Sequence, residues 1–403
     1  MICLAKTLAL SASFLIAVSA APSPSPPPSG DYLFVWAMDA DFAQSDFLAV
    51  VDLDRNAPTF ASVVATAPTG VKKGFSHHSE HQMPPGGVLF ANGFGAGQTW
   101  LFDLRQPKSP KIRASFTDAG AMMHPHSFVR LPNNNVLATF QMTGHANEAP
   151  GGLAEIDNDG KIVRTSPLTG LPNDEFVRPY SLAVVPALDR IVTTSSDMHE
   201  KGIARTVQIW RLSDLKYLST VILPPGPRDK VNLDPAEPRL LTDGKTVMVS
   251  TFNCGLFLLD RIDSAAPSAK LVHDFVGPGY CAIPVIAGQY WVQTNPGLPG
   301  LVSLDIADPA HPRVVDKLVL GKDEQPHWIS LAPDGRRIII SGGDKELKSR
   351  LLMARIDAKT GKLSLDETFR PAGATRSGVD FDRPNWPHGD SDKAIPHGAV
   401  FSR

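Results

Sequence analysis

The stretch HPHSFVRLPNNNVLATFQ, residues 124–141, has the pattern of two β-strands joined by a tight turn. Apolar residues dominate both arms, and the asparagines between them are residue types that favour turns. Two histidines, His124 and His126, open the first arm. Similar pieces recur along the chain, several with a Pro-His step at the same place. The repeat, more than any single segment, therefore decides the fold.

The chain from residue 31 onward divides into seven units of about 40 to 70 residues with the same internal order. The third unit, for example, consists of HPHSFVRLP, NVLATFQ, GGLAEID and KIVRTSP. Each unit holds short apolar-rich segments separated by Gly, Pro, Asn and Asp, which is the composition of strands joined by hairpin turns. No segment keeps a 3.6-residue apolar period, so we expect no helix beyond single turns.

The first unit lacks its leading strand, and the last segment, IPHGAVF at residues 395–401, supplies one with no other partner. We therefore predict an all-β protein, a seven-bladed β-propeller over residues 31–403. Its ring is closed by the C-terminal strand, which removes an exposed strand edge. The 36 prolines and 32 glycines also suit a protein built from many turns.

The N-terminal residues have the pattern of a secretory signal peptide, residues 1–20. Lys6 is followed by an apolar run at residues 8–18 and by the small-residue cleavage pattern Val18-Ser19-Ala20. A Pro/Ser-rich linker follows at residues 21–30. The apolar run is too short to span a bilayer, and no other is long enough, so we expect no membrane span in the mature chain. These features predict a periplasmic or secreted protein.

The charge balance argues against a nucleic-acid partner. Lys and Arg number 39, Asp and Glu number 41, and no basic stripe is present to neutralise phosphates. Six predicted third strands end in aspartate, which indicates either a ring of metal carboxylates or, as we expect, turn capping. These aspartates are Asp52, Asp103, Asp157, Asp260, Asp305 and Asp357.

The leading strand of each propeller blade lines the central channel, so its first residues, which we call the start residues, can be compared between blades. They are Ser76-His77-His78, Pro125-His126-Ser127, Pro179-Tyr180-Ser181, Glu237-Pro238-Arg239, Tyr280-Cys281-Ala282, Pro326-His327-Trp328 and Pro396-His397-Gly398. Four of the seven sets carry histidine, although the chain has only 12. Imidazoles converging on one axis favour Cu, Zn or Fe over Ca or Mg. We predict a metal site built from His77 or His78 with His126, His327 and His397.

Other polar residues receive subsidiary interpretations. His81 and His124 flank the predicted site and could orient its ligands. Glu237 is the candidate proton acceptor, with an ion pair to Arg239 or Arg178 as the alternative. Loop, outer-strand and turn positions are expected for the remaining histidines: His145 and His199 in loops on the ligand face, His273 and His311 on outer strands or turns, and His388 in a loop of undetermined place.

Cys254 and Cys281 are the cysteines that remain after the signal peptide. They could pair, since an oxidising compartment favours disulfides, or stay as small buried thiols. Cys281 is also a start residue and a conceivable copper ligand, although a disulfide to Cys254 is the stronger expectation. GFGAGQ at residues 93–98 joins two predicted strands and is interpreted as a hairpin, because no helix follows it as a phosphate-binding loop would require.

Several motifs resemble the selenium-binding protein/methanethiol oxidase family. They are the pair His77-His78, PHSFVRLPNNNVLATFQ followed by PGGLAEID, and LVSLDIADPAHPRVVDKLVLG followed by ISLAPDGRRIIIS. His77, His78, His126, His397 and the acidic Glu237 match motif positions, whereas His327 falls where members often lack histidine. The cysteine motif that follows the family's histidine pair is replaced by SEHQMPPGG.

The resemblance implies a copper-dependent oxidase that converts methanethiol, oxygen and water to formaldehyde, hydrogen sulfide and hydrogen peroxide. We therefore predict a copper-dependent oxidase of a small thiol, with iron or zinc as alternative metals and Glu237 as the catalytic residue that accepts protons. The alternative is a non-catalytic propeller of the cell envelope that binds metal or protein, because the propeller fold hosts many functions.

Overall fold

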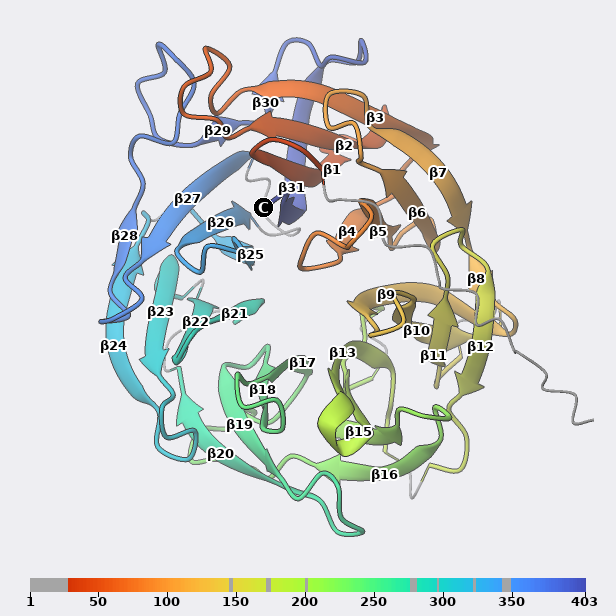
Figure 1. Ribbon diagram of the computed structural model, residues 1–403. Coiled ribbons are helices and arrows are strands. Elements are labelled where there is room, and N and C mark those ends of the chain that lie inside the picture. Colours follow the sequence, from red (N-terminus) through yellow and green to blue (C-terminus); the bar gives the residue numbers. More distant parts are fainter. Residues whose placement is uncertain are drawn as a thin grey trace, which may run out of the picture.

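Seven β-sheets stand around a central axis in the computed structural model of this chain (Figure 1). The structure describes residues 28–144, 148–171, 175–199, 202–275, 281–295, 297–321, 324–342 and 349–403. The predicted signal peptide, residues 1–20, and most of the predicted linker, residues 21–30, lie outside these ranges. The all-β, seven-bladed propeller predicted from the sequence is confirmed.

Each blade has four main strands, which follow one another from the channel outward. Blade 1 is β31 (Asp392–Phe401), β1 (Tyr32–Asp39), β2 (Ser45–Asp52) and β3 (Val63–Lys72). Blade 2 is β4 (Ser76–Ser79), β5 (Val88–Gly93), β6 (Gln98–Asp103) and β7 (Lys111–Phe116). Blade 3 is β9 (Met122–Arg130), β10 (Val136–Thr143), β11 (Gly152–Ile156) and β12 (Ile162–Pro167). Blade 4 is β13 (Pro179–Val185), β14 (Arg190–Ser195), β15 (Thr206–Arg211) and β16 (Tyr217–Ile222).

The remaining blades have the same order. Blade 5 is β17 (Pro235–Leu240), β18 (Val247–Thr251), β19 (Gly255–Asp260) and β20 (Ser268–Asp274). Blade 6 is β21 (Pro284–Ala287), β22 (Tyr290–Asn295), β23 (Gly300–Asp305) and β24 (Arg313–Val319). Blade 7 is β25 (Pro326–Leu331), β26 (Arg337–Gly342), β27 (Arg350–Ile356) and β28 (Leu363–Leu365). Two-residue strands β8 (Asp118–Ala119), β29 (Val379–Asp380) and β30 (Asp382–Arg383) extend blades 3, 7 and 1.

The C-terminal strand closes the ring as predicted. β31 pairs antiparallel with β1, with Leu33 opposite Phe401 and Val35 opposite Ala399. The closure is extended past the strand end, because Ser402 accepts the Tyr32 N–H through Oγ at 2.8 Å. In the described ranges the only helix is the 3₁₀ turn η1 (Pro186–Leu188), and no helix there has the length and apolar character that a membrane crossing requires.

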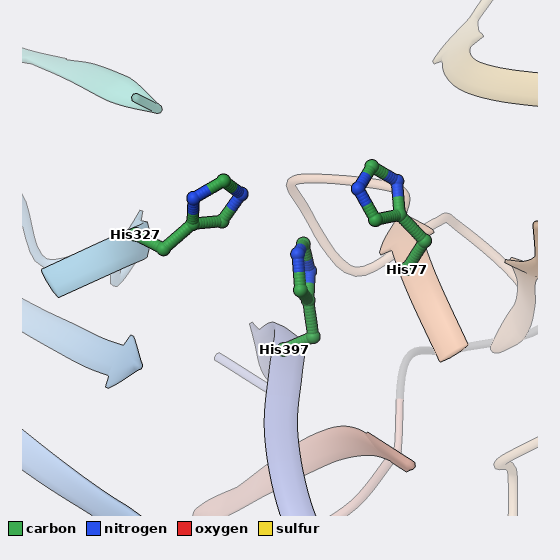
Figure 2. Close-up of side chains that lie close together, drawn as sticks. All are labelled: His77, His327 and His397. Atoms are coloured by element: carbon green, nitrogen blue, oxygen red, sulfur yellow. The ribbon is translucent and has the colours of Figure 1, made fainter. Parts of the chain in front are cut away.

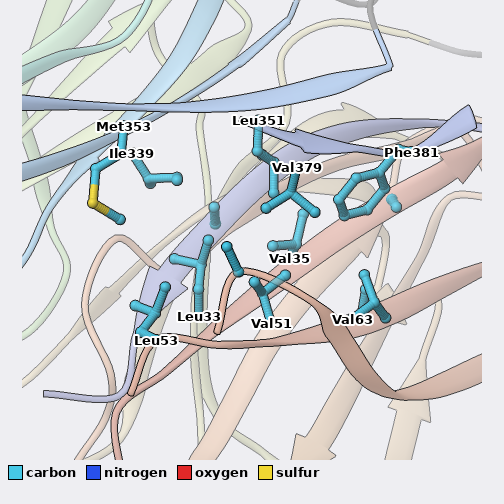
Figure 3. Close-up of a cluster of buried hydrophobic side chains, with 14 of the residues drawn as sticks. Leu33, Val35, Val51, Leu53, Val63, Ile339, Leu351, Met353, Val379 and Phe381 are labelled. Atoms are coloured by element: carbon cyan, nitrogen blue, oxygen red, sulfur yellow. The ribbon is translucent and has the colours of Figure 1, made fainter. Parts of the chain in front are cut away.

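The apolar core lies between neighbouring blades. Figure 3 shows one such cluster, in which Leu33, Val35 and Val51 of blade 1 face Ile339 and Leu351 of blade 7. Full burial of an aliphatic or aromatic side chain contributes about 1.5–3 kcal/mol, so these inter-blade layers hold the ring together. The channel-lining strands can then carry polar side chains without supplying the main core.

Most aspartates at the ends of third strands cap turns, as expected. One carboxylate oxygen accepts a backbone N–H two residues later in five of the six cases: Asp52, Asp103, Asp157, Asp305 and Asp357. The sixth, Asp260, forms an ion pair with the neighbouring Arg261 at 3.0 Å. These side chains stabilise the outer turns, far from any common centre.

Six inner strands carry a one-residue register shift at their start, the mark of a β-bulge. The shifts fall within Ser76–Ser79, Pro125–Phe128, Pro179–Leu182, Pro235–Pro238, Pro326–Trp328 and Pro396–Ala399. They correct the predicted start of blade 5 by two residues, because Pro235 is the position equivalent to Pro125 and Pro179. The start residues there are Pro235-Ala236-Glu237.

Candidate metal centre

The five histidines predicted as metal ligands come together inside the channel. Each is at most 4% exposed, and they come from β4, β9, β25 and β31: His77, His78, His126, His327 and His397. Figure 2 shows His77, His327 and His397 converging from three strands. We call these five residues the histidine cluster. Its ring centroids are 4.3 Å apart between His78 and His126 and 4.8 Å between His327 and His397.

The cluster contains two three-histidine groups in which one ring nitrogen from each residue lies within 4.8 Å of the others. The first group is His77, His327 and His397, and the second is His77, His78 and His126. His77 belongs to both groups. Each group could hold a metal ion, and the shared residue means that the two positions are adjacent and not independent.

The bulge in β4 explains how two successive histidines reach the same place. Side chains alternate between the two faces of a regular strand, so His77 and His78 would point apart. An extra residue breaks this alternation. The N–H of His78, displaced from the ladder, donates to Oδ1 of Asn92 at 2.6 Å. Asp46 holds the strand start by accepting the N–H of Ser76 at 2.8 Å and its hydroxyl at 2.9 Å.

The tautomer of His126 follows from one hydrogen bond. Nδ1 of His126 lies 2.8 Å from the carbonyl oxygen of Tyr180, which can only accept, so Nδ1 carries the proton. Nε2 therefore keeps its lone pair, and it is buried without a hydrogen-bond partner. A backbone carbonyl that orients a ring in this way is a common partner of metal-binding histidines. The Oγ of Ser127 lies 3.0 Å from the same Nδ1 and 2.9 Å from Nδ1 of His78.

Burial keeps His77, His78 and His126 in the neutral form. It lowers the pKa values of His77 and His78 well below the ordinary value, and mutual repulsion with His126 lowers them further. The pKa of His126 itself is lowered to about 3, mainly by burial. Neutral imidazole is the form that binds metals. Nδ1 of His77 is also buried without a hydrogen-bond partner. The cluster therefore presents lone pairs in a place where protons bind poorly.

Glu237 belongs to neither three-histidine group. It is fully buried, and it forms the ion pair with Arg239 that was the alternative expectation, at 2.5 Å. Its Oε2 also accepts the hydroxyl of Ser181 at 2.8 Å. Burial raises the pKa of Glu237, and Arg239 and Ser181 act in the opposite direction. Oε1 of Glu237 is buried without a hydrogen-bond partner.

His81 flanks the cluster as predicted. Its ring stacks on the indole of Trp328 with 4.5 Å between centroids and 4° between planes. Nη2 of Arg239 lies 3.4 Å from its Nε2, and burial with this cation lowers the pKa of His81. Trp328 also packs edge-on against His78 at 5.0 Å. Arg178, the other predicted partner of Glu237, instead pairs with Asp197 at 3.2 Å.

The other predicted positions have the following places. His273 lies on the outer strand β20, and His311 lies in an exposed turn beside Asp308. Nδ1 of His388 lies 2.8 Å from Oγ1 of Thr66, which fixes that loop against blade 1. His145 lies outside the described residues. His124 and His199 lie together beside Phe94.

Cys254 and Cys281 form a disulfide, with 4.9 Å between their Cα atoms. The disulfide links the second to third strand loop of blade 5 to the start of blade 6. It decides between the two states that the sequence allowed, and it removes Cys281 as a copper ligand, since a disulfide sulfur offers no thiolate.

Sequence reasoning did not identify several residues that shape the site. Phe94 of the GFGAGQ hairpin packs against His77 and His126, with centroids 6.1 and 5.7 Å away. Tyr180 packs on His126 at 3.9 Å, and its hydroxyl lies 3.5 Å from Nε2 of His78. Tyr180 occupies in blade 4 the position that His126 occupies in blade 3, so the alignment of start residues was the signal for it.

The fold and cluster define a seven-bladed propeller with a buried histidine cluster that could bind metal. No protein-family model matches the chain, and no curated protein matches it. Among solved structures, a hypothetical selenium-binding protein from Sulfolobus tokodaii is 16% identical with a TM-score of 0.75, covering 94% of this chain and 96% of that one. A periplasmic gluconolactonase from Pseudomonas aeruginosa is 13% identical with a TM-score of 0.63, covering 92% and 98%. At these identities the similarities support the propeller fold alone.

Proposed function

We propose that this protein is a periplasmic or secreted metal-dependent oxidase of a small thiol such as methanethiol, with copper in the histidine cluster. One observation carries the proposal: five buried imidazoles form two overlapping groups of possible metal ligands. Burial of polar rings is costly unless their nitrogens are satisfied, and a bound ion would satisfy the open nitrogens of His77 and His126.

The donor set fits a transition metal. Both groups consist of histidine alone in the described part of the chain, whereas Ca²⁺ and Mg²⁺ require oxygen ligands. Imidazole suits Cu, Zn and Fe. His77 and His126 would hold the ion through Nδ1 and Nε2, the atoms that are buried without hydrogen bonds. Copper is chosen from the sequence resemblance, and metal analysis distinguishes it from iron and zinc.

The proposed reaction is the oxidation of methanethiol by oxygen with water, giving formaldehyde, hydrogen sulfide and hydrogen peroxide. Carbon is oxidised, oxygen is reduced to the peroxide, and the C–S bond is broken. Copper, when bound, would supply redox capacity and a Lewis acid for sulfur. The protein's own task is then to exclude water, hold the small substrate and remove protons.

The aromatic rings around the cluster would limit what enters. Phe75 stacks on His77 at 5.9 Å, and Phe94, Tyr180 and Trp328 pack against other cluster rings. Such a wall favours a small apolar molecule with one polar atom, which describes methanethiol. It also keeps bulk water from the ligands, so that electrostatic interactions there are strong.

In this proposal Glu237 takes the thiol proton. Its raised pKa makes it a better base than an ordinary carboxylate, and Oε1 has no other hydrogen bond to compete. Two successive residues connect it to the cluster: Tyr180 packs on His126, while Ser181 donates to Glu237. Arg239 also contacts Oε2 of Glu237 and holds the carboxylate in place.

The test combines metal analysis with thiol-dependent oxygen uptake. Wild-type protein purified from its native compartment should carry stoichiometric copper and consume oxygen when methanethiol is added. The double variant His126→Ala/His397→Ala should lose both properties, whereas His311→Ala, in an exposed turn, should lose neither. Unchanged metal content in the double variant would refute the metal site. Full copper occupancy with no oxygen uptake would favour a non-catalytic metal-binding propeller.

A further inference from the structure

We propose that His124 and His199 form a second metal site, at the channel mouth, that captures an ion and passes it to the histidine cluster. We call these two residues the mouth pair. The inference rests on the proposed metal binding by the cluster. It adds a path by which a metal ion reaches the buried histidines. Both residues are half-buried, in contrast to the cluster.

The geometry of the mouth pair suits a shared ion. The two rings meet edge-on, with 5.5 Å between centroids and 87° between planes. Imidazole nitrogens bind Zn²⁺ and similar ions at about 2.0–2.1 Å, so two rings on one ion have centroids on the order of 5 Å apart. The two rings, with centroids 5.5 Å apart, would therefore need to move little to bind one ion.

His124 is held in a conformation that local preferences do not explain. Its φ is 55°, a left-handed value that is uncommon for a non-glycine residue. Its Nδ1 lies 3.1 Å from the carbonyl oxygen of Phe94 and so carries the proton, which leaves the lone pair on Nε2. This is the same arrangement as that of His126. Gly97 makes room for the ring, because a Cβ there would lie 3.2 Å from Cε1 of His124.

The carboxylate of Asp197 positions His199. Oδ1 of Asp197 accepts the N–H of His199 at 2.9 Å, and Oδ2 accepts the N–H of Gly202 at 3.0 Å. The charge of Asp197 is balanced by Arg178. Asp234 lies close enough to Asp197 for the two carboxylates to repel each other. Among the described residues, Asp197 and Asp234 thus bring two carboxylates near Arg178, and carboxylates attract cations.

Phe94 separates the mouth pair from the cluster and touches both. Its ring centroid lies 5.4 Å from that of His124 and 5.2 Å from that of His199 on the outer side. On the inner side it lies 5.7 Å from His126 and 6.1 Å from His77. His124 and His126 are two residues apart on β9, and the phenyl ring of Phe94 packs against both imidazoles.

The test follows Co²⁺ binding to metal-free protein by its visible absorption. Asparagine adopts positive φ more readily than most residues, so the variant is His124→Asn/His199→Asn, with His311→Asn as the matched control. The double variant should bind one ion fewer than wild type and load the cluster at least tenfold more slowly, with the same final cluster spectrum. Equal stoichiometry and equal loading rate would overturn the mouth site.

A second pair of variants separates this inference from the proposed function. His126→Ala/His397→Ala should keep the ion at the mouth pair while losing the cluster ion. Phe94→Ala should load the cluster faster than wild type, because the phenyl barrier is gone. If the cluster of wild-type protein binds no Co²⁺, the proposed function fails. If the His124→Asn/His199→Asn variant fills the cluster normally and matches wild type in both Co²⁺ stoichiometry and loading rate, only the mouth site fails.

Discussion

The imidazole rings of His77 and His78 lie parallel, with 4.4 Å between their centroids and 4° between their planes. Successive residues of a strand meet in this way only because the β4 register shifts by one residue beneath them. The stack puts His77 in contact with both sides of the cluster, at 4.9 Å from His126 and 4.5 Å from His397. His77 is therefore the residue on which both possible metal positions depend.

Replacement of His77 should weaken metal binding more than replacement of His327. His77→Ala removes a ligand from both three-histidine groups, whereas His327→Ala leaves the second group complete. We expect little bound metal after dialysis of His77→Ala and partial retention in His327→Ala, measured by elemental analysis. Equal retention in the two variants would contradict a shared ligand.

Ser127 should affect metal affinity without being a ligand. Its Oγ lies within 3.0 Å of Nδ1 of both His78 and His126, so it orients both rings. Loss of such an orienting group commonly lowers metal affinity by about 10–100-fold. We expect Ser127→Ala to do so in a competition titration. Ser181→Ala is the matched control, because Ser181 has the equivalent position in blade 4 but contacts Glu237; it should alter turnover and leave affinity near wild type.

The metal-free protein should lose stability as the pH falls below about 6.5, the ordinary histidine value. The pKa of His126 is lowered to about 3 in the fold, so between these values the unfolded chain binds more protons than the folded one. The contribution of neutral His126 to the free energy of unfolding is complete above about pH 6.5 and is lost as the pH falls toward 3. Urea unfolding of His126→Asn should show a shallower decline than wild type over this window.

Asp46 should change the stability with pH in the direction opposite to that of His126. Burial raises its pKa to about 6, so the folded state holds its proton more tightly than the unfolded state. This contribution is present at low pH and is lost as the pH rises through 6. Asp46→Asn should therefore steepen the acid-induced decline. The free energy of unfolding, measured in urea at several pH values, tests this prediction. If Asp46→Asn lowers it by the same amount at every pH, Asp46 acts only through its hydrogen bonds to Ser76.

Ring closure should be essential for solubility. β31 buries Ile395, Val400 and Phe401, and each such side chain contributes about 1.5–3 kcal/mol. Removal of residues 392–403 also exposes the edge of β1 and takes away His397. We expect that truncation to aggregate on expression, while removal of the exposed Arg403 alone should leave the melting temperature unchanged.

The disulfide should contribute on the order of 3 kcal/mol, because it closes a loop with a sequence separation of 27 residues. Cys254→Ala/Cys281→Ala should lower the free energy of unfolding by about that amount in denaturant titrations. Reductant should destabilise wild-type protein similarly and leave the double variant unaffected. A wild-type midpoint that is insensitive to full reduction would contradict this contribution.

The sequence alone was enough to predict the blades, the closing strand and the five cluster histidines. Short apolar segments between turn residues specify strands locally, and the repeat makes positions comparable, so Pro125-His126, Pro326-His327 and Pro396-His397 could be aligned without coordinates. The blade 5 start was misplaced by two residues, since Pro-Ala-Glu-Pro offers two prolines to align and only strand pairing chooses between them.

Contacts between residues far apart in the chain were decided by the tertiary structure. The bulge that turns His77 and His78 to one side depends on pairing with β5, and the proton of His126 depends on a carbonyl of blade 4. Three other features also depend on contacts between distant parts of the chain. They are the hydrogen bond that Glu237 accepts from a serine of blade 4, the disulfide, and the packing of Phe94 against both sets of histidines. Local sequence determines which side chains a strand carries; only closure of the ring determines which of them meet.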